Sequence, residues 1–231
     1  MNIQFDKKTV LVTGGTGGLG RAVSLALLQA GAKVIVSYRH QEEMDSLVKE
    51  AGALAAKLSG QALDVTDEAA MREFIDKQGA IDALVNAVGG YIAGATLWEM
   101  DAKVLDQMLS LNLKSGFVAA RVAVPDMLKQ GRGAIVNVAA TAAMTHPAAA
   151  AAYAASKAAA VAMIDSLAAD LKGTGVRANS IMPSIIDTPA NRKAMPDADF
   201  TKWPKPEDIA QVVLFLCSDE SKVIHGAAIP V

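Results

Sequence analysis

Short apolar runs alternate along this chain with longer segments in which apolar residues recur at helical spacing. Several of the short runs are apolar at nearly every position, which is typical of parallel strands buried on both faces. This alternation indicates a doubly wound α/β fold with a parallel sheet of about seven strands and helices on both faces. The predicted strands are 9–12, 33–37, 61–65, 83–86, 134–138, 177–181 and 227–231. The predicted helices lie near 18–30, 41–51, 67–77, 101–111, 114–130, 150–173 and 206–217.

One long segment, residues 183–206, shows neither spacing. It contains five prolines and follows the carboxyl end of the sixth predicted strand, where loops commonly carry substrate contacts. We therefore expect a loop that covers the substrate. Since the 231 residues contain no linker and no internal repeat, we expect a single domain over residues 1–231.

The composition narrows the class of partner. The net charge is −2 and no basic run is present, which argues against nucleic acid. No stretch of 18 residues is free of polar interruption, and the first nine residues are polar, so we expect a cytoplasmic protein without a membrane segment. The expected partner is a small-molecule substrate. Cys217 falls in an apolar helical pattern and the histidines lack metal-ligand spacing, so we expect a buried thiol and no metal site.

A glycine-rich loop directly follows the first predicted strand and precedes the first predicted helix. Glycines allow a tight turn and a close approach to a pyrophosphate, while the helix N-terminus offers unpaired N–H groups to phosphate oxygens. Strand, glycine loop and helix in this order predict a Rossmann-type domain that binds a dinucleotide. The loop residues expected to contact it are Thr13, Gly14, Thr16, Gly17, Gly18, Leu19 and Gly20.

A tyrosine and a lysine stand one helical turn apart in the predicted helix 150–173. Tyr153 and Lys157 therefore share a face of the helix, which brings a phenol beside an ammonium. The positive charge favours the phenolate, and a tyrosine, whose pKa is ordinarily about 10, needs such help to exchange protons near neutrality. We expect this pair to carry acid/base chemistry; the alternative is a surface helix with a solvated lysine.

Together these motifs resemble the short-chain dehydrogenases/reductases, a family of nicotinamide-dependent oxidoreductases. The threonine and glycines of the loop have the spacing of that family. The resemblance implies a third active-site residue, Asn112, beside Tyr153 and Lys157. It also implies cofactor contacts at Asp64, Val65, Asn86, Ala87, Pro183, Ile186 and Thr188. Ala87 and Val88 replace the family's Asn and Ala, which removes a side chain that braces the central strand.

The serine that orients the substrate in this family is missing. An ungapped match anchored on Tyr153 places Ala140 at its position. Loss of that hydroxyl weakens stabilisation of a developing alkoxide by a factor on the order of 10². Three explanations stay open: Thr141 replaces the serine, the protein is catalytically inactive, or the substrate needs no alkoxide stabiliser.

Two segments resemble dihydropteridine reductase, a family member that also has alanine in place of the serine. Residues 188–203 are similar to its substrate loop, and the Gly-Gly-aromatic segment that ends at Tyr91 is similar to its own. An aromatic ring there would lie against a flat heterocycle. The resemblance implies hydride transfer from reduced nicotinamide to a quinonoid dihydropterin, with Tyr153 as proton donor. The expected substrate contacts are Ala140, Thr141, Tyr91, Asn191, Met195 and Trp203.

Two other functions stay open. The first is a carbonyl or hydroxyl oxidoreductase, similar to 3-oxoacyl or ketone reductases, in which Thr141 substitutes for the serine. The second is a dinucleotide-binding sensor without turnover. Retention of Asn112, Tyr153 and Lys157 argues against a sensor, because a sensor needs no proton relay.

The end of the second predicted strand indicates which dinucleotide binds. An acidic side chain there would hold the ribose 2′-hydroxyl and repel a 2′-phosphate. The sequence has no acid between Ser37 and His40, and Arg39 would pair with a 2′-phosphate. We expect NADP(H), with NAD(H) still possible, although the resemblance to dihydropteridine reductase implies NADH.

The family resemblance also concerns assembly. Members of the family usually pair the two long helical segments that here span about 101–130 and 150–173. Small alanine side chains in the second segment permit close approach. The resemblance therefore implies a homodimer or homotetramer.

Overall fold

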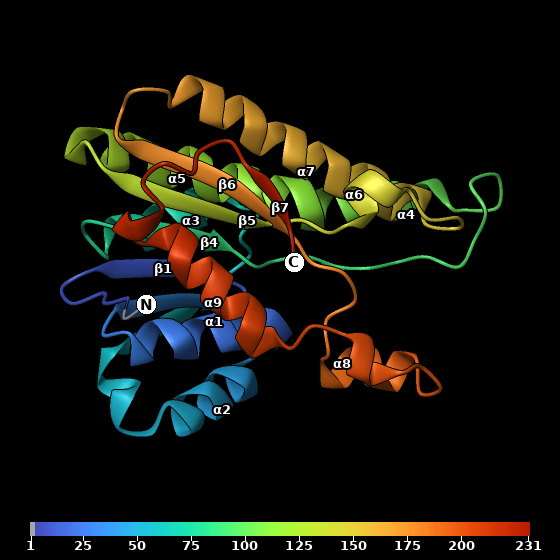
Figure 1. The fold of residues 1–231 in the computed structure, drawn as a ribbon, viewed down its shortest axis with the longest axis horizontal. Helices are drawn as coiled ribbons and strands as arrows, with labels where there is room; N and C mark the ends of the chain where they lie inside the picture. Colours follow the sequence, from blue (N-terminus) through green and yellow to red (C-terminus); the bar gives the residue numbers. More distant parts are fainter. Residues whose placement is uncertain (1–2) are drawn as a thin grey trace.

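The computed structural model describes residues 3–231. Within this range all strands belong to one parallel sheet, in the order β3-β2-β1-β4-β5-β6-β7 (Figure 1). This order confirms the predicted Rossmann-type α/β fold. The direction of winding reverses between β1 and β4, and sheets of this kind bind ligands in a crevice at the carboxyl ends of the strands beside such a reversal. The strands are β1 Thr9–Thr13, β2 Lys33–Tyr38, β3 Leu58–Ala62, β4 Ala83–Asn86, β5 Gly133–Val138, β6 Val176–Met182 and β7 Ala228–Pro230.

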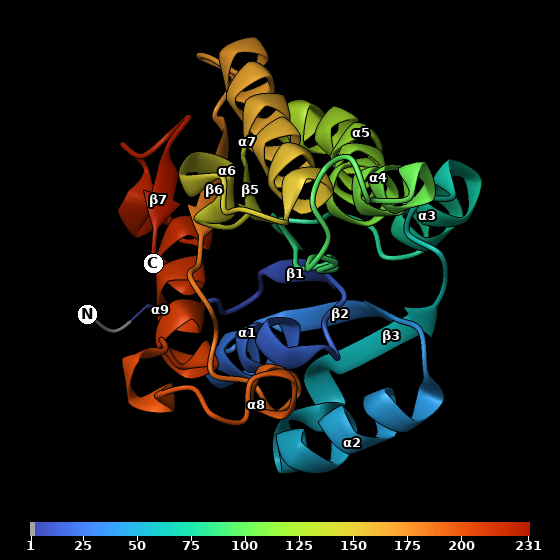
Figure 2. The same cartoon turned by 90° about the vertical axis from the view of Figure 1, so that its right-hand side faces the viewer.

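Helices cover both faces of the sheet (Figure 2). α1, α2 and α9 lie on one face, whereas α3, α4, α5 and α7 lie on the other. The helices in the described part of the chain are α1 Gly18–Gln29, α2 Gln41–Ala51, α3 Glu68–Asp76, α4 Ala102–Leu109, α5 Ser115–Gln130, α6 Ala142–Thr145, α7 Ala151–Asp170, α8 Pro189–Ala194 and α9 Pro206–Cys217.

The hydrophobic core has two halves, one on each face of the sheet. In β1, Val10 and Val12 pack in the half that includes α1 and α9, whereas Leu11 packs in the half that includes α3, α5 and α7. Successive side chains of a strand point to opposite faces. The continuous apolar run in β1 is therefore what burial on both faces requires.

Most boundaries lie within one or two residues of the predicted ones, and the largest differences are in the third strand and the long helix near the active site. The third strand occupies Leu58–Ala62 rather than residues 61–65, and a 3₁₀ helix, Gly52–Lys57, leads into it. β3 lies at the edge of the sheet and pairs only with β2. Such a strand stays partly exposed and lacks the continuous apolar run on which the prediction relied. The helix predicted over 150–173 ends at Asp170.

The connection between α4 and α5 is helical, although the sequence predicts two separate helices. Ser110–Lys114 form a π-helical turn that continues α4 directly into α5. Widened turns of this kind are rare and often occur at functional sites. Asn112, the predicted active-site asparagine, lies within it and is buried.

The segment 183–206 contains more regular structure than a loop. Pro189–Ala194 form α8, which begins after Thr188 because the Thr188 hydroxyl accepts a hydrogen bond from the Asn191 N–H (3.2 Å) and proline suits the first helical turn. In Figure 1, α8 stands apart from the sheet at the end where the strands finish.

The described residues contain no helix long and apolar enough to cross a membrane. The same part of the chain has no group of three or more histidine, cysteine or acidic side chains that could hold a metal ion. Cys217 is buried in α9, as predicted, and burial raises the pKa of its thiol to about 12.

Candidate active site

The glycine loop lies at the carboxyl end of β1 and is tied to the end of β2. The Gly14 N–H donates to the Ser37 hydroxyl (3.0 Å), and the Gly15 N–H donates to the Ser37 carbonyl (3.2 Å). A Cβ atom on Gly20 would lie 2.1 Å from the Gly14 carbonyl oxygen, so a larger residue there would displace the turn. Gly17 provides no side-chain cap to α1, which leaves the first N–H groups of that helix for an anion.

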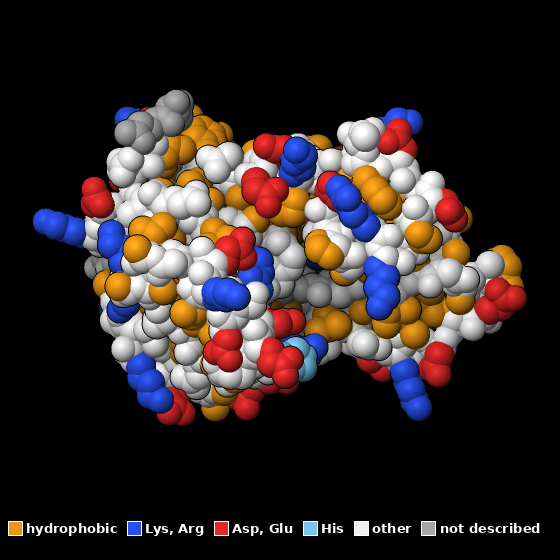
Figure 3. Space-filling model, turned by 90° about the horizontal axis from the view of Figure 1, so that it is seen from below, with side chains coloured by type: hydrophobic (Ala, Val, Ile, Leu, Met, Phe, Trp, Pro, Cys, Tyr) orange, Lys and Arg blue, Asp and Glu red, His pale blue; other side chains and the backbone are white. Residues whose placement is uncertain are grey.

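The segment after β6 approaches the glycine loop. A Cβ atom on Gly18 would lie 2.9 Å from the Thr188 methyl carbon. The backbone of the loop therefore faces Thr188 without an intervening side chain, and this bare cradle fits the pyrophosphate of a dinucleotide. Seen from below, on the side of α1, α2 and α8, the molecular surface is hollowed, with acidic and basic side chains along the rim (Figure 3).

Two predicted cofactor residues, Thr13 and Asn86, form hydrogen bonds between strands beneath the loop. The Thr13 hydroxyl donates to Asn86 Oδ1 (2.7 Å), and Asn86 Nδ2 donates to Asn137 Oδ1 (2.9 Å), so the side chains link β1, β4 and β5. All three are almost fully buried. They provide the brace that the alanine at position 87 cannot, and only the backbone of Thr13 and Asn86 remains for contact with a cofactor.

The predicted lysine and asparagine meet at the backbone of Gly89. Lys157 Nζ donates to the Val138 carbonyl (2.9 Å) at the end of β5. A Cβ atom on Gly89 would lie 2.9 Å from Asn112 Oδ1 and 3.1 Å from Lys157 Nζ. The two side chains, which are distant in sequence, therefore approach the same point beyond β4.

Asn112 also connects to the helix that carries the tyrosine. Its Oδ1 accepts from the Gly90 N–H (2.9 Å), and its Nδ2 donates to the Gly90 carbonyl (3.0 Å) and to Ser156 Oγ (2.9 Å). Ser156 Oγ in turn donates to the Tyr153 carbonyl (2.8 Å). This network fixes the segment after β4 against α7, and thereby positions all three predicted catalytic residues in one region.

The pKa values of Tyr153 and Lys157 differ from the simple expectation of an ammonium that favours a phenolate. Burial, followed by the nearby Tyr91 phenol, raises the pKa of Tyr153 to about 12. Burial lowers the pKa of Lys157 to about 8. Desolvation thus outweighs the attraction that the sequence suggests. At neutral pH Tyr153 is a neutral phenol, the form that can donate a proton.

The position of the missing serine is occupied by a buried methyl group. Ala140 lies just before α6 and is 7% exposed. The next residue, Thr141, donates its backbone N–H to the Pro183 carbonyl (2.9 Å), and its side chain is only partly buried. Among residues 3–231, the Thr141 hydroxyl caps no helix and forms no hydrogen bond, so it has no partner within the protein.

Tyr91, a predicted substrate contact, lies against the predicted proton donor. Its ring meets that of Tyr153 edge to face, with 4.8 Å between centroids and an interplanar angle of 84°. Nevertheless 69% of Tyr91 is exposed. An exposed ring beside a catalytic phenol offers a stacking surface to a flat substrate.

The substrate loop is held together by its own side chains. Asn191 Nδ2 donates to the Ile186 carbonyl (2.8 Å), and the Met195 N–H donates to the Asn191 carbonyl (2.9 Å). The Asn191 amide, predicted as a substrate contact, is therefore engaged in the loop. Ile186 contributes its backbone to this arrangement.

A second set of contacts closes the loop. Arg192 pairs with Asp187 through two hydrogen bonds (2.5 and 2.8 Å) and lies over the Phe200 ring, 4.8 Å from its centroid. The Phe200 ring packs against Trp203 at 4.9 Å. Arg192 thus forms an ion pair that holds the loop together and is not an unpaired surface charge. Trp203 packs within the loop.

Residues after β2 and β3 come together at one rim of the crevice. Arg39 is exposed and follows β2 directly. The Asp64 carboxylate accepts hydrogen bonds from the Thr66 N–H and hydroxyl (both 2.8 Å), which hold its pKa below the usual value, and Arg39 lowers it further. Val65, the other predicted contact there, is buried.

An acidic side chain from outside the strand end at residues 37–40 also reaches the glycine loop. The Thr16 hydroxyl donates to Glu43 Oε2 (2.8 Å). Glu43 belongs to the first turn of α2. This acid comes from a helix that folds back over the loop, and not from the end of the strand.

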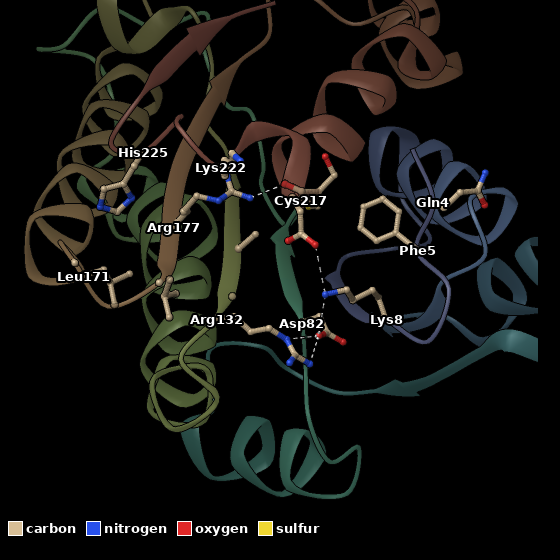
Figure 4. Close-up of a pocket in the computed structure, with 17 residues that line it drawn as sticks. Gln4, Phe5, Lys8, Asp82, Arg132, Leu171, Arg177, Cys217, Lys222 and His225 are labelled. Carbon is tan, nitrogen blue, oxygen red and sulfur yellow. Dashed lines mark hydrogen bonds and ion pairs between the residues drawn. The ribbon is translucent and has the colours of Figure 1, made fainter. Parts of the chain in front are cut away.

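A separate cavity of about 360 Å³ lies at the amino-terminal end of the strands (Figure 4). Its ionic groups are largely paired with each other. Asp82 pairs with Lys8 (3.8 Å) and Arg132 (3.0 Å), and Arg177 donates to the Leu216 and Ser218 carbonyls. The hydrogen bonds of Arg177 tie the end of α9 to the sheet. The polar side chains around this cavity therefore stabilise the fold, and we assign no ligand to it.

The comparisons with known proteins agree with this geometry. A model of the short chain dehydrogenase family matches residues 8–199, and the chain belongs to that family. A curated relative, the 3-oxoacyl-[acyl-carrier-protein] reductase FabG of Thermotoga maritima, is 37% identical and covers 98% of this chain and 97% of its own.

Two solved structures with at least 25% sequence identity superpose along nearly the whole chain. A 3-oxoacyl-[acyl-carrier protein] reductase from Brucella melitensis has a TM-score of 0.91 and 27% identity, covering 100% of this chain and 92% of its own. ElxO with NADP bound has a TM-score of 0.91 and 25% identity, covering 97% and 96%. These comparisons provide no support for a specific likeness to dihydropteridine reductase, which the substrate loop suggested.

Proposed function

We propose that this protein is an NAD(P)H-dependent reductase of a carbonyl group, in the class of 3-oxoacyl and ketone substrates. The observation that carries the proposal is the convergence of Asn112, Tyr153 and Lys157 beside the glycine cradle. The similarity to the Thermotoga maritima reductase over nearly the full length supports the substrate class. This reading corresponds to the alternative function left open by the sequence.

The side chains have distinct roles in this proposal. A bound reduced nicotinamide would supply the hydride. Tyr153, a neutral phenol at pH 7, donates its proton to the substrate oxygen. Lys157, whose pKa is about 8, is mainly protonated and stabilises negative charge on the phenol oxygen. The free hydroxyl of Thr141 takes the place of the serine as the donor that orients the carbonyl.

For the dinucleotide we propose NADP(H) ahead of NAD(H). Arg39 is exposed at the end of β2, the position where a 2′-phosphate is recognised in this type of fold. A guanidinium binds a phosphate group through paired hydrogen bonds. A cytoplasmic location and a single domain over residues 1–231 remain predictions.

A second candidate substrate is a quinonoid dihydropterin. Ala140 supports it, because an electron-poor ring accepts hydride without building charge on a carbonyl oxygen and needs no serine. The exposed Tyr91 ring beside Tyr153 also suits a flat heterocycle.

Steady-state oxidation of NADPH and NADH separates the candidates when it is measured with a 3-oxoacyl thioester, a panel of ketones and a quinonoid dihydropterin. Turnover of the thioester or ketones supports the first proposal. Turnover of the pterin alone would replace it with the second. Binding of dinucleotide without any turnover would favour the non-catalytic sensor.

Thr141→Val is expected to lower kcat for carbonyl substrates by about 10²-fold, because it removes the hydroxyl that orients the oxygen. Adding Ala140→Ser to this variant restores most of the rate. Ala139→Ser, which adds a hydroxyl one position away, is the matched control and restores nothing. An unchanged kcat for carbonyl substrates in Thr141→Val would refute the role of Thr141. If the pterin is the substrate, Thr141→Val is expected to reduce it at the wild-type rate.

We also propose that the protein forms a homodimer or homotetramer through α4, α5 and α7. Phe117 and Leu105 are 51% and 41% exposed on these helices, and Leu109, Leu113 and Met163 line a shallow hollow beside Phe117. Apolar surface of this kind favours association. Sedimentation velocity is expected to give a species larger than 23.9 kDa.

Phe117→Glu is expected to shift this species toward the monomer, because it buries a charge in the proposed interface. Val48→Glu places the same charge on an exposed apolar position of α2, away from these helices, and serves as the control. A monomeric wild type, or equal assembly of both variants, would contradict the proposed interface.

A further inference from the structure

Glu43 is held at the glycine loop by contacts on both its side chain and its backbone. Its carboxylate accepts the hydrogen bond from the buried Thr16 hydroxyl (2.8 Å). Its carbonyl accepts from the Arg21 guanidinium (3.2 Å), which also binds Glu50 (2.9 Å). The first turn of α2 is therefore fastened to α1, and the carboxylate of the exposed Glu43 is held beside the glycine loop.

Glu43 lies close to the region where the ribose of a dinucleotide binds, because the glycine loop adjoins the end of β2. Gly14 and Gly15 are bonded to Ser37 at the end of β2, and the ribose of a bound dinucleotide is recognised at this end of the strand. Thr16 follows these glycines, so its hydrogen-bond partner faces the same region. The crevice rim thus carries a carboxylate beside the loop and a guanidinium, Arg39, beyond β2.

We propose that Glu43 is a specificity-determining residue that lowers the preference for NADPH. Its carboxylate repels a 2′-phosphate and can accept a hydrogen bond from a 2′-hydroxyl, while Arg39 attracts the phosphate. The two side chains act in opposite directions, so the wild type discriminates weakly between the two dinucleotides. This inference rests on the proposed function only in so far as that function requires a dinucleotide in the crevice.

The size of the effect follows from the charges. A phosphate monoester carries roughly −1.5 to −2 charges at pH 7. Repulsion from one carboxylate about 6 Å away, screened as in bulk water, corresponds to at most about a tenfold change in affinity. Between exposed groups this effect weakens as salt screens the charges.

The test is direct binding of NADPH and NADH, followed by the fluorescence of the reduced nicotinamide, so it needs no substrate. Glu43→Gln keeps an acceptor for Thr16 but removes the charge. It is expected to tighten NADPH binding by up to about tenfold and to change NADH binding by less than about twofold. Glu42→Gln makes the same charge change at the exposed neighbouring position, whose side chain forms no hydrogen bond with residues 13–20, and is expected to leave both affinities unchanged.

Two further measurements sharpen the result. Arg39→Ala in the Glu43→Gln background is expected to return the affinity ratio toward that of the wild type, and higher salt is expected to reduce the effect of Glu43→Gln. An unchanged NADPH to NADH ratio in Glu43→Gln, or an equal shift in Glu42→Gln, would overturn the proposal. Normal binding without turnover of any substrate would overturn the proposed reductase function and leave this inference intact, whereas absence of any dinucleotide binding would overturn both.

Discussion

Tyr153→Phe is expected to reduce turnover by about 10³-fold, within the range that a positioned general acid contributes. The substitution removes only the phenol oxygen. The ring remains half-buried beside Tyr91, so the fold and the edge-to-face contact are retained. The loss should therefore appear in kcat, with dinucleotide affinity close to that of the wild type.

The matched control for this variant is Tyr91→Phe, which removes the neighbouring phenol and keeps its ring. Tyr91 contributes to the raised pKa of Tyr153, after burial. Its replacement is expected to leave most activity and to move the alkaline limb of the pH profile to lower pH. If Tyr153→Phe retained full activity, Tyr153 would not be the proton donor.

Lys157→Met is expected to have opposite effects on activity and on stability. Activity should fall by about 10²-fold or more, because the stabilising positive charge is lost. Stability at pH 7 should rise by about 1–3 kcal/mol, because the wild type holds a buried ammonium whose pKa is about 8 instead of 10.5. Loss of the bond to the Val138 carbonyl offsets part of this gain.

The direction of the pH dependence follows from the lowered pKa. Between about pH 8 and 10.5 the unfolded chain binds more protons at Lys157 than the folded chain does, so wild-type stability rises with pH through that window. The advantage of Lys157→Met should shrink accordingly. Above pH 10 the raised pKa of Tyr153 acts in the opposite direction, so urea unfolding is best compared between pH 7 and 9.5.

Lys172→Met provides the control, since this lysine is exposed just beyond α7. It is expected to change neither activity nor the pH dependence of stability. A Lys157→Met enzyme that is fully active, or one that is less stable than the wild type at pH 7, would show that the buried ammonium has a different role.

The alanine at position 140 does not by itself identify the substrate, although the sequence suggests that it does. Ala140 and residues 188–203 pointed to a pterin, whereas the relatives identified along the full chain include a 3-oxoacyl reductase. The structure adds a free hydroxyl at Thr141, one residue away. The missing serine shows which hydrogen bond position 140 cannot donate, but neighbouring groups such as the Thr141 hydroxyl decide which substrates the site can reduce.

The sequence by itself determined the fold and the family. Short apolar runs at the centres of β1, β2, β4 and β5 are unbroken because those strands are buried on both faces, and this pattern is visible without coordinates. The glycine loop could be recognised because its neighbours in sequence are also its neighbours in space. The pair Tyr153 and Lys157 could be recognised because one helical turn separates them.

Tertiary structure alone decided contacts between residues that are distant in the chain. The bond between Thr16 and Glu43, the brace from Thr13 to Asn137, and the network around Asn112 all depend on how strands and helices pack. The raised pKa of Tyr153 likewise depends on burial, which is a property of the whole fold. Local spacing cannot reveal these features, because it records neither distance across the sheet nor access of water.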